Sequence, residues 1–73
     1  MIDIEKIADE ADLIVNGYAF TVSQNQIKIL NLNFPDCATN LALDGKVLET
    51  NMNDIELSIV LDYFKQNSKF LEL

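Results

Sequence analysis

Apolar residues near the N-terminus recur at a helical spacing. From residue 4 onward, the i, i+3, i+4, i+7 spacing of one helix face is followed by six apolar residues: Ile4, Ile7, Ala8, Ala11, Ile14 and Val15. This pattern predicts an amphipathic helix over residues 3–15, with Asp3 as its N-cap and Asn16–Gly17 as its left-handed end. The alternative is a hairpin turn at Asn16–Gly17, joining strands over residues 13–15 and 18–20. The helix is preferred because Ile14 and Val15 keep the helical phase.

Two segments rich in β-branched and aromatic residues follow, and they predict a first hairpin. Its strands cover residues 18–22 and 27–32, on either side of a polar four-residue loop. Pairing Val22 with Ile27 places Phe20 opposite Ile29 on one face of the sheet. On the other face Ala19 then lies opposite Leu30.

A second hairpin is predicted by Asp44–Gly45, a dipeptide that favours a type I′ turn with positive φ at both positions. Its strands cover residues 39–43 and 46–50. This turn pairs Leu41 with Leu48, and it pairs Ala42 with Val47 on the reverse face. Pro35 separates the two hairpins because it cannot continue a strand ladder.

The best-defined boundary is the start of a C-terminal helix over residues 53–66. Asn53 can cap it, Glu56 can reach back to the cap, and Met52 can pack on Leu57. The apolar stripe of this helix is formed by Leu57, Val60, Leu61 and Phe64, and is widened by Ile55 and Ile59. Residues 68–73 form an apolar tail that we expect to dock on the domain.

The element order predicts one α+β domain over residues 1–73, arranged helix–hairpin–hairpin–helix, with an antiparallel sheet of about four strands. The chain has 73 residues, and 49% of them are hydrophobic. A domain this small buries only about 60% of the surface that its unfolded chain exposes. Stability must therefore come from tight packing or from a partner chain.

The charge of the chain narrows the class of partner. Twelve acidic residues against five lysines give a net charge of −7. This balance argues against direct binding to nucleic acid or to anionic membranes, which both require cationic side chains.

The sequence contains neither a secretory signal nor an apolar run of about 20 residues, so we expect a cytoplasmic protein. The abundance of Asn and Ile is typical of short genes from AT-rich bacteria or their phages.

The residues available for chemistry do not predict an enzyme. The chain has no His and no Arg, which are the usual proton-transfer and anion-stabilising side chains. Cys37 has no second cysteine, and the group Asp9, Glu10 and Asp12 does not match a calcium loop. We therefore expect no catalytic residue, no metal and no cofactor.

Three hypotheses for function remain. The first is a protein-interaction module that forms a homodimer through apolar sheet and tail residues: Ala19, Leu30, Leu32, Ala42, Val47, Phe70 and Leu71. The second is an acidic decoy that binds a basic nucleic-acid-binding protein through the exposed side of its first helix, formed by Asp3, Glu5, Asp9, Glu10 and Asp12. The third is a closed monomer with one helix on each face of the sheet.

Overall fold

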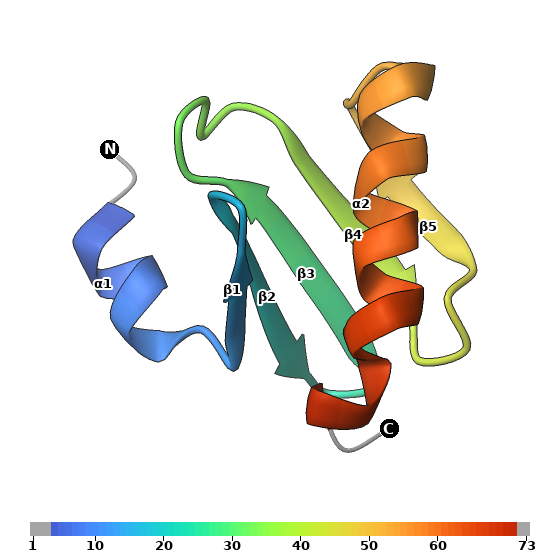
Figure 1. Ribbon diagram of the computed structural model, residues 1–73, viewed down its shortest axis with the longest axis horizontal. Coiled ribbons are helices and arrows are strands. Elements are labelled where there is room, and N and C mark those ends of the chain that lie inside the picture. The colour runs from blue at the N-terminus through green and yellow to red at the C-terminus, as the bar shows by residue number, and fades with distance from the viewer. Residues whose placement is uncertain (1–3, 72–73) are drawn as a thin grey trace.

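The structure is a computed structural model that describes residues 4–71, which form a five-stranded antiparallel sheet and two α-helices. The elements in chain order are α1 (Ile4–Glu10), β1 (Leu13–Val15), β2 (Tyr18–Ser23), β3 (Gln26–Asn31), β4 (Ala38–Ala42), β5 (Val47–Thr50), α2 (Asp54–Asn67) and a 3-10 helix, η1 (Ser68–Leu71). The strands lie in the order β1-β2-β3-β4-β5, so each pairs with its neighbour in the sequence (Figure 1). The α+β class is confirmed, with one strand more than predicted.

The additional strand is β1, which replaces the second half of the predicted N-terminal helix. Val15 lies opposite Tyr18, and the turn residues Asn16 and Gly17 have φ values of +48° and +83°. The single helix over residues 3–15 is therefore wrong, and the alternative hairpin is correct. A run of three apolar residues fits both the helical and the strand period, and the β-branched pair Ile14 and Val15 favours the strand. The predicted cap, Asp3, lies outside the described residues.

The register of the first predicted hairpin is confirmed. Val22 lies opposite Ile27, and Ala19 lies opposite Leu30. The loop is shorter than predicted, because Ser23 pairs with Gln26 and only residues 24–25 form the turn. Both turn residues have positive φ, at +44° and +71°, which is the geometry of a type I′ hairpin.

The β4–β5 hairpin differs from the prediction beside its turn. Gly45 has the expected positive φ of +94°, and its N–H donates to the Ala42 carbonyl at 2.9 Å. The loop thus holds three residues rather than two, which shifts the pairing so that Leu41 lies opposite Val47. The ladder is irregular at this point, and Asn40 lies opposite Glu49 as the original register requires. Leu48 lies in the resulting bulge, and 49% of its surface is exposed.

The C-terminal helix starts as predicted, since the Asn53 side chain accepts the Glu56 N–H at 2.7 Å. Its most buried side chains are Val60 and Phe64. The wider stripe is wrong, because Ile55 and Ile59 are 76% and 41% exposed. The core lies between α2 and one face of the sheet, and its buried members are Phe20, Ile27, Ile29, Leu41, Met52, Val60, Phe64 and Leu71.

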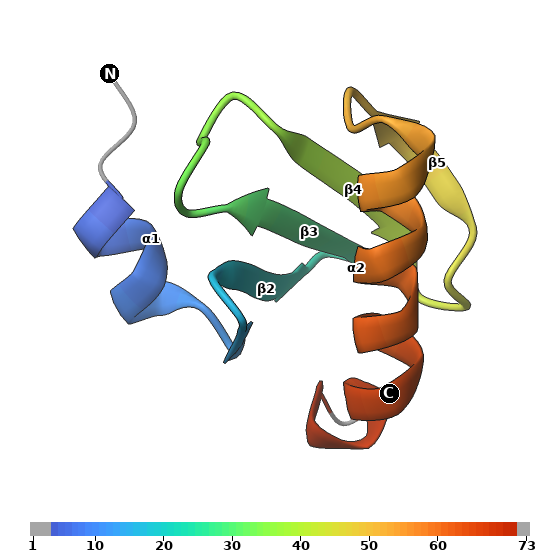
Figure 2. The ribbon, with the colours of Figure 1, turned by 45° about the horizontal axis from the view of Figure 1, so that its top comes forward.

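The two helices lie in different places relative to the sheet. In both ribbon views α2 runs across the sheet, whereas α1 lies beyond the end formed by β1 (Figures 1 and 2). The sheet face turned away from α2 is called the open face below. None of the helices within residues 4–71 has the length and apolar character needed to span a bilayer.

Candidate interaction surfaces

The open face carries an apolar row beside a polar row. Strand register places one residue from each of four neighbouring strands in each row. The apolar row crosses β1 to β4 and consists of Ile14, Ala19, Leu30 and Ala38. The polar row crosses β2 to β5 and consists of Thr21, Lys28, Asn40 and Glu49. This face therefore presents both apolar atoms and charges of both signs.

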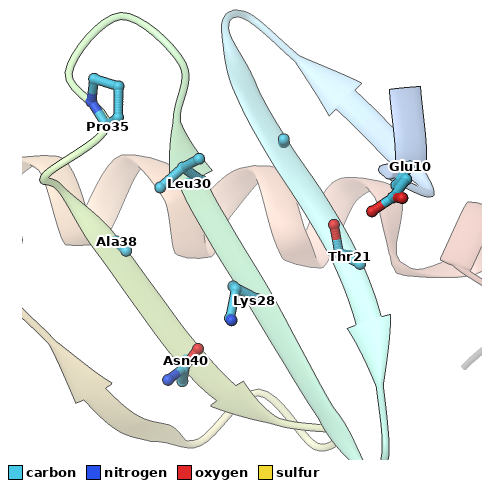
Figure 3. Close-up of a pocket in the computed structure, with 8 residues that line it drawn as sticks. Glu10, Thr21, Lys28, Leu30, Pro35, Ala38 and Asn40 are labelled. Atoms are coloured by element: carbon cyan, nitrogen blue, oxygen red, sulfur yellow. The ribbon is translucent and has the colours of Figure 1, made fainter. Parts of the chain in front are cut away.

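A hollow of about 450 Å³ lies over these two rows. Glu10, at the end of α1, and Pro35, in the connection from β3 to β4, stand at opposite sides of it (Figure 3). Figure 3 also shows α2 on the far side of the sheet from this hollow. The floor includes Ala19 and Leu30, which are only 1% and 6% exposed. The hollow is thus a concave site whose apolar floor is largely buried, rather than a broad exposed apolar patch.

The residues predicted from the sequence as an interface do not share one surface. Ala19, Leu30 and Ala42 occupy the open face, as the strand register places them. The assignment of Val47 is wrong, because the shifted turn places it on the side of Leu41, against the core. Leu71 is also misassigned, since it is a buried core residue at the end of η1. Of the remaining two, Leu32 is half-buried after β3, whereas Phe70 is 61% exposed.

The predicted acidic helix face is divided by the early end of α1. Asp9 and Glu10 are exposed on the helix, and Glu10 lines the open-face hollow. Asp12 lies beyond the helix, where its Oδ2 accepts the Val22 N–H at 2.7 Å. Its placement on the helix is therefore wrong. Asp3 lies outside the described residues, and the side chain of Glu5 is not among those described.

A second surface is built around Glu56, on the opposite side of the sheet from the open-face hollow. Glu56 Oε2 accepts hydrogen bonds from the Tyr18 hydroxyl and from Asn31 Nδ2, both at 2.8 Å. The Tyr18 ring lies 6.1 Å from the Tyr63 ring, and the Tyr63 hydroxyl accepts a bond from Asn16 Nδ2. The first turn of α2 is thereby fixed to β2 and β3.

This environment changes the acidity of Tyr18. Burial of the phenol, followed by its hydrogen bond to Glu56, raises the pKa of Tyr18 from 10.0 to about 12. The nearby carboxylate charge acts in the same direction, because ionised Tyr18 would place a second negative charge beside it. Tyr18 therefore remains a neutral hydrogen-bond donor at physiological pH.

Three exposed apolar side chains and four asparagines line this second site. Phe34, Ile55 and Ile59 are 67%, 76% and 41% exposed, and all three line a second hollow of about 450 Å³ together with Tyr18 and Glu56. The sequence prediction missed this site because it assigned both isoleucines to the core. It also assigned Glu56 to a local capping role, whereas the side chain bonds to the sheet.

Comparison with family models places the chain in a group of related sequences. Residues 1–71 match the model of a family of unknown function, DUF7723. The chain belongs to this family. The match extends over α1, the whole sheet, α2 and η1, so both surfaces lie within the family domain. Searches of curated proteins and of solved structures found no significant match.

Two kinds of described side chain in this family member remain to be placed: the acidic groups and the cysteine. Within residues 4–71, no group of three or more Cys, Asp or Glu side chains is placed to hold a metal ion. Cys37 is a free, half-buried thiol that packs against the core.

Proposed function

We propose that this chain is a non-catalytic protein-interaction module that forms a homodimer through the open face of its sheet. The observation that carries the proposal is the apolar row from Ile14 to Ala38, which lies on the face that α2 leaves uncovered. Ile14 is 47% exposed, so part of this row contacts solvent in a single chain. Association would remove that apolar surface from water.

A second copy of the chain fits this face because the face carries its own complementary charges. Lys28 and Glu49 both lie in the polar row, with Asn40 between them, and Glu10 stands at the side of the same hollow. In a two-fold symmetric interface the same surface of each chain contacts the other copy. Lys28 of each chain can therefore face an acidic side chain of the other chain, which gives two such contacts per dimer. Such contacts offset part of the repulsion between two chains of net charge −7.

The size of the molecule sets how much of this face the interface must use. A specific interface buries about 800 Å² on each partner. The two longest extents of the chain are 30 and 25 Å, so a dimer of this kind must use most of one broad side. Figure 1 looks along the shortest axis with α2 in front of the sheet, which leaves the open face as the opposite broad side.

Light scattering on two charge-reversal variants tests the proposal. Lys28→Glu places a negative charge at the centre of the open face, whereas Lys65→Glu makes the same change at an exposed position of α2, on the other side of the sheet. In about 0.3 M salt, where long-range repulsion is screened, we expect the parent chain and Lys65→Glu to be dimers. Lys28→Glu should have the mass of one chain, 8.3 kDa. A monomeric parent chain at high micromolar concentration would refute the proposal.

A further inference from the structure

The Glu56 surface is a second site, independent of the open face. It forms where the β1–β2 turn, the β3–β4 connection and the first turns of α2 meet, and these contribute Asn16, Phe34 and Ile55 respectively. Three elements far apart in the sequence thus build one hollow. It lies on the α2 side of the sheet, so dimer formation through the open face would leave it accessible.

The Glu56 carboxylate, which lines this hollow, is held in position by hydrogen bonds. Both hydrogen bonds to Glu56, from Tyr18 and Asn31, end on Oε2. Within residues 4–71 no hydrogen bond to Oε1 and no lysine paired with Glu56 is found. A carboxylate that is already oriented loses little side-chain entropy when a cation binds to it.

The lining of the hollow also supplies three large apolar side chains, beside four asparagines. Phe34 extends from the β3–β4 connection, and Ile55 and Ile59 lie one turn apart on α2. Phe34 is 67% exposed and Ile55 is 76% exposed. Exposed large apolar side chains around a concave site are typical of recognition surfaces.

From these observations we infer that the Glu56 hollow binds a segment of another protein that presents an arginine or lysine next to a large apolar side chain. The cation binds Glu56, and the apolar neighbour packs between Phe34 and Ile55. Charge complementarity supports this occupant, because the chain has a net charge of −7 and a carboxylate lines the site. An anionic ligand would meet repulsion from both.

Capped five-residue peptides provide the probe. One peptide has a central arginine between leucine and phenylalanine, and its counterpart has citrulline in place of arginine, which keeps the shape and removes the charge. Binding is followed through backbone amide shifts in ¹⁵N-labelled protein. We expect the arginine peptide to give saturable shifts around residues 16, 33–34 and 53–59. The citrulline peptide should bind more weakly by about fivefold or more, since a charge-assisted hydrogen bond is lost.

Two charge-neutralising variants in α2 distinguish binding of the peptide at Glu56 from a general electrostatic attraction of the peptide to the acidic chain. Glu56→Gln keeps an oxygen that can accept from Tyr18 and Asn31, and we expect it to lose about fivefold or more of the affinity for the arginine peptide. Asp62→Asn removes the same charge from an exposed position further along α2 and should leave that affinity nearly unchanged. Amide spectra of both variants verify that they fold.

A third variant tests the apolar part of the inference. Ile55→Ser removes an exposed side chain, so it should weaken binding of the arginine peptide without unfolding the domain. Equal affinity for the arginine and citrulline peptides would overturn the inference. So would unchanged affinity in Glu56→Gln, or the absence of saturable shifts with every peptide at millimolar concentration.

Discussion

Gly45 and Phe64 lie so close together that a side chain at residue 45 would have to displace the Phe64 ring. A Cβ atom at Gly45 would lie 3.0 Å from Phe64 Cε2, and the φ of Gly45 is +94°. Phe64 is a buried core residue of α2. The turn between β4 and β5 therefore packs directly onto the helix, and the glycine meets both a conformational and a steric requirement.

Gly45→Ala should consequently cost more stability than the matched change Gly17→Ala. Gly17 also has a positive φ, +83°, but a Cβ there would meet Asn33 Nδ2 at 3.1 Å, the end of an exposed side chain that can move. Both variants incur about 1–2 kcal/mol of backbone strain. We expect an additional cost of about 1 kcal/mol at Gly45 from displacement of the Phe64 ring, measured by urea unfolding. Equal losses would show that the ring moves aside freely.

The bulge at Leu48 leads to a second prediction. Truncation of Val47, the smaller side chain, should cost more stability than truncation of Leu48. Val47 lies opposite Leu41 and packs against the core, whereas Leu48 is 49% exposed. Val47→Ala should lower the free energy of unfolding by about 1–2 kcal/mol, and Leu48→Ala by about 0.5 kcal/mol or less. Thermal unfolding of the two variants checks this order. A larger loss in Leu48→Ala would support the register predicted from the sequence instead.

Much of the sheet and the start of α2 could be predicted because their signals are local. Val22 and Ile27 flank a polar turn, so their pairing follows from the alternation of side chains between the two faces of the sheet. Asn53 caps α2 by accepting a hydrogen bond from the backbone N–H of Glu56, three residues further along the chain. The β1 strand was missed because its three apolar residues fit two periods at once. The shift at Val47 was missed because turn composition alone does not distinguish a two-residue from a three-residue loop.

The Glu56 site could not be predicted because it depends on tertiary contacts. Glu56 has the spacing of a capping box, and this local role competes with bonds to Tyr18 and Asn31 that form only when α2 packs on the sheet. Ile55 and Ile59 fit an apolar helix face in the sequence. They remain exposed because the contact between α2 and the sheet does not extend far enough around the helix to cover them. The open face was easier to predict, since Ala19 and Leu30 follow from strand alternation.

The raised pKa of Tyr18 predicts a loss of stability at high pH. The folded-state pKa of about 12 lies above the ordinary value of 10.0, so the contribution of the neutral phenol is fully present below pH 10.0. It should be lost as pH rises from there through about 12. Unfolding of the parent chain should depend more steeply on pH in this window than unfolding of Tyr18→Phe. Absorbance titration of tyrosinate gives a second measure, and Glu56→Gln should lower the pKa of Tyr18 toward its ordinary value.

Salt dependence distinguishes contact through the open face from a general effect of charge. Two chains of net charge −7 repel each other, and salt reduces this repulsion because the screening length is only about 10 Å at 0.1 M. The dissociation constant of the dimer should therefore fall as salt rises from about 0.05 to 0.5 M. Analytical ultracentrifugation across this range measures the effect.

The variants Lys28→Glu and Lys65→Glu carry the same net charge, so long-range repulsion should weaken both dimers to a similar extent at low salt. Because Lys65 is exposed on α2, away from the open face, salt should restore the affinity of Lys65→Glu to nearly that of the parent chain. In Lys28→Glu the reversed charge lies inside the proposed interface, where it is excluded from solvent and less screened. Its weaker association should therefore persist at 0.5 M salt, roughly five times the ionic strength that gives a 10 Å screening length. Full recovery of both variants would place the contact away from the open face.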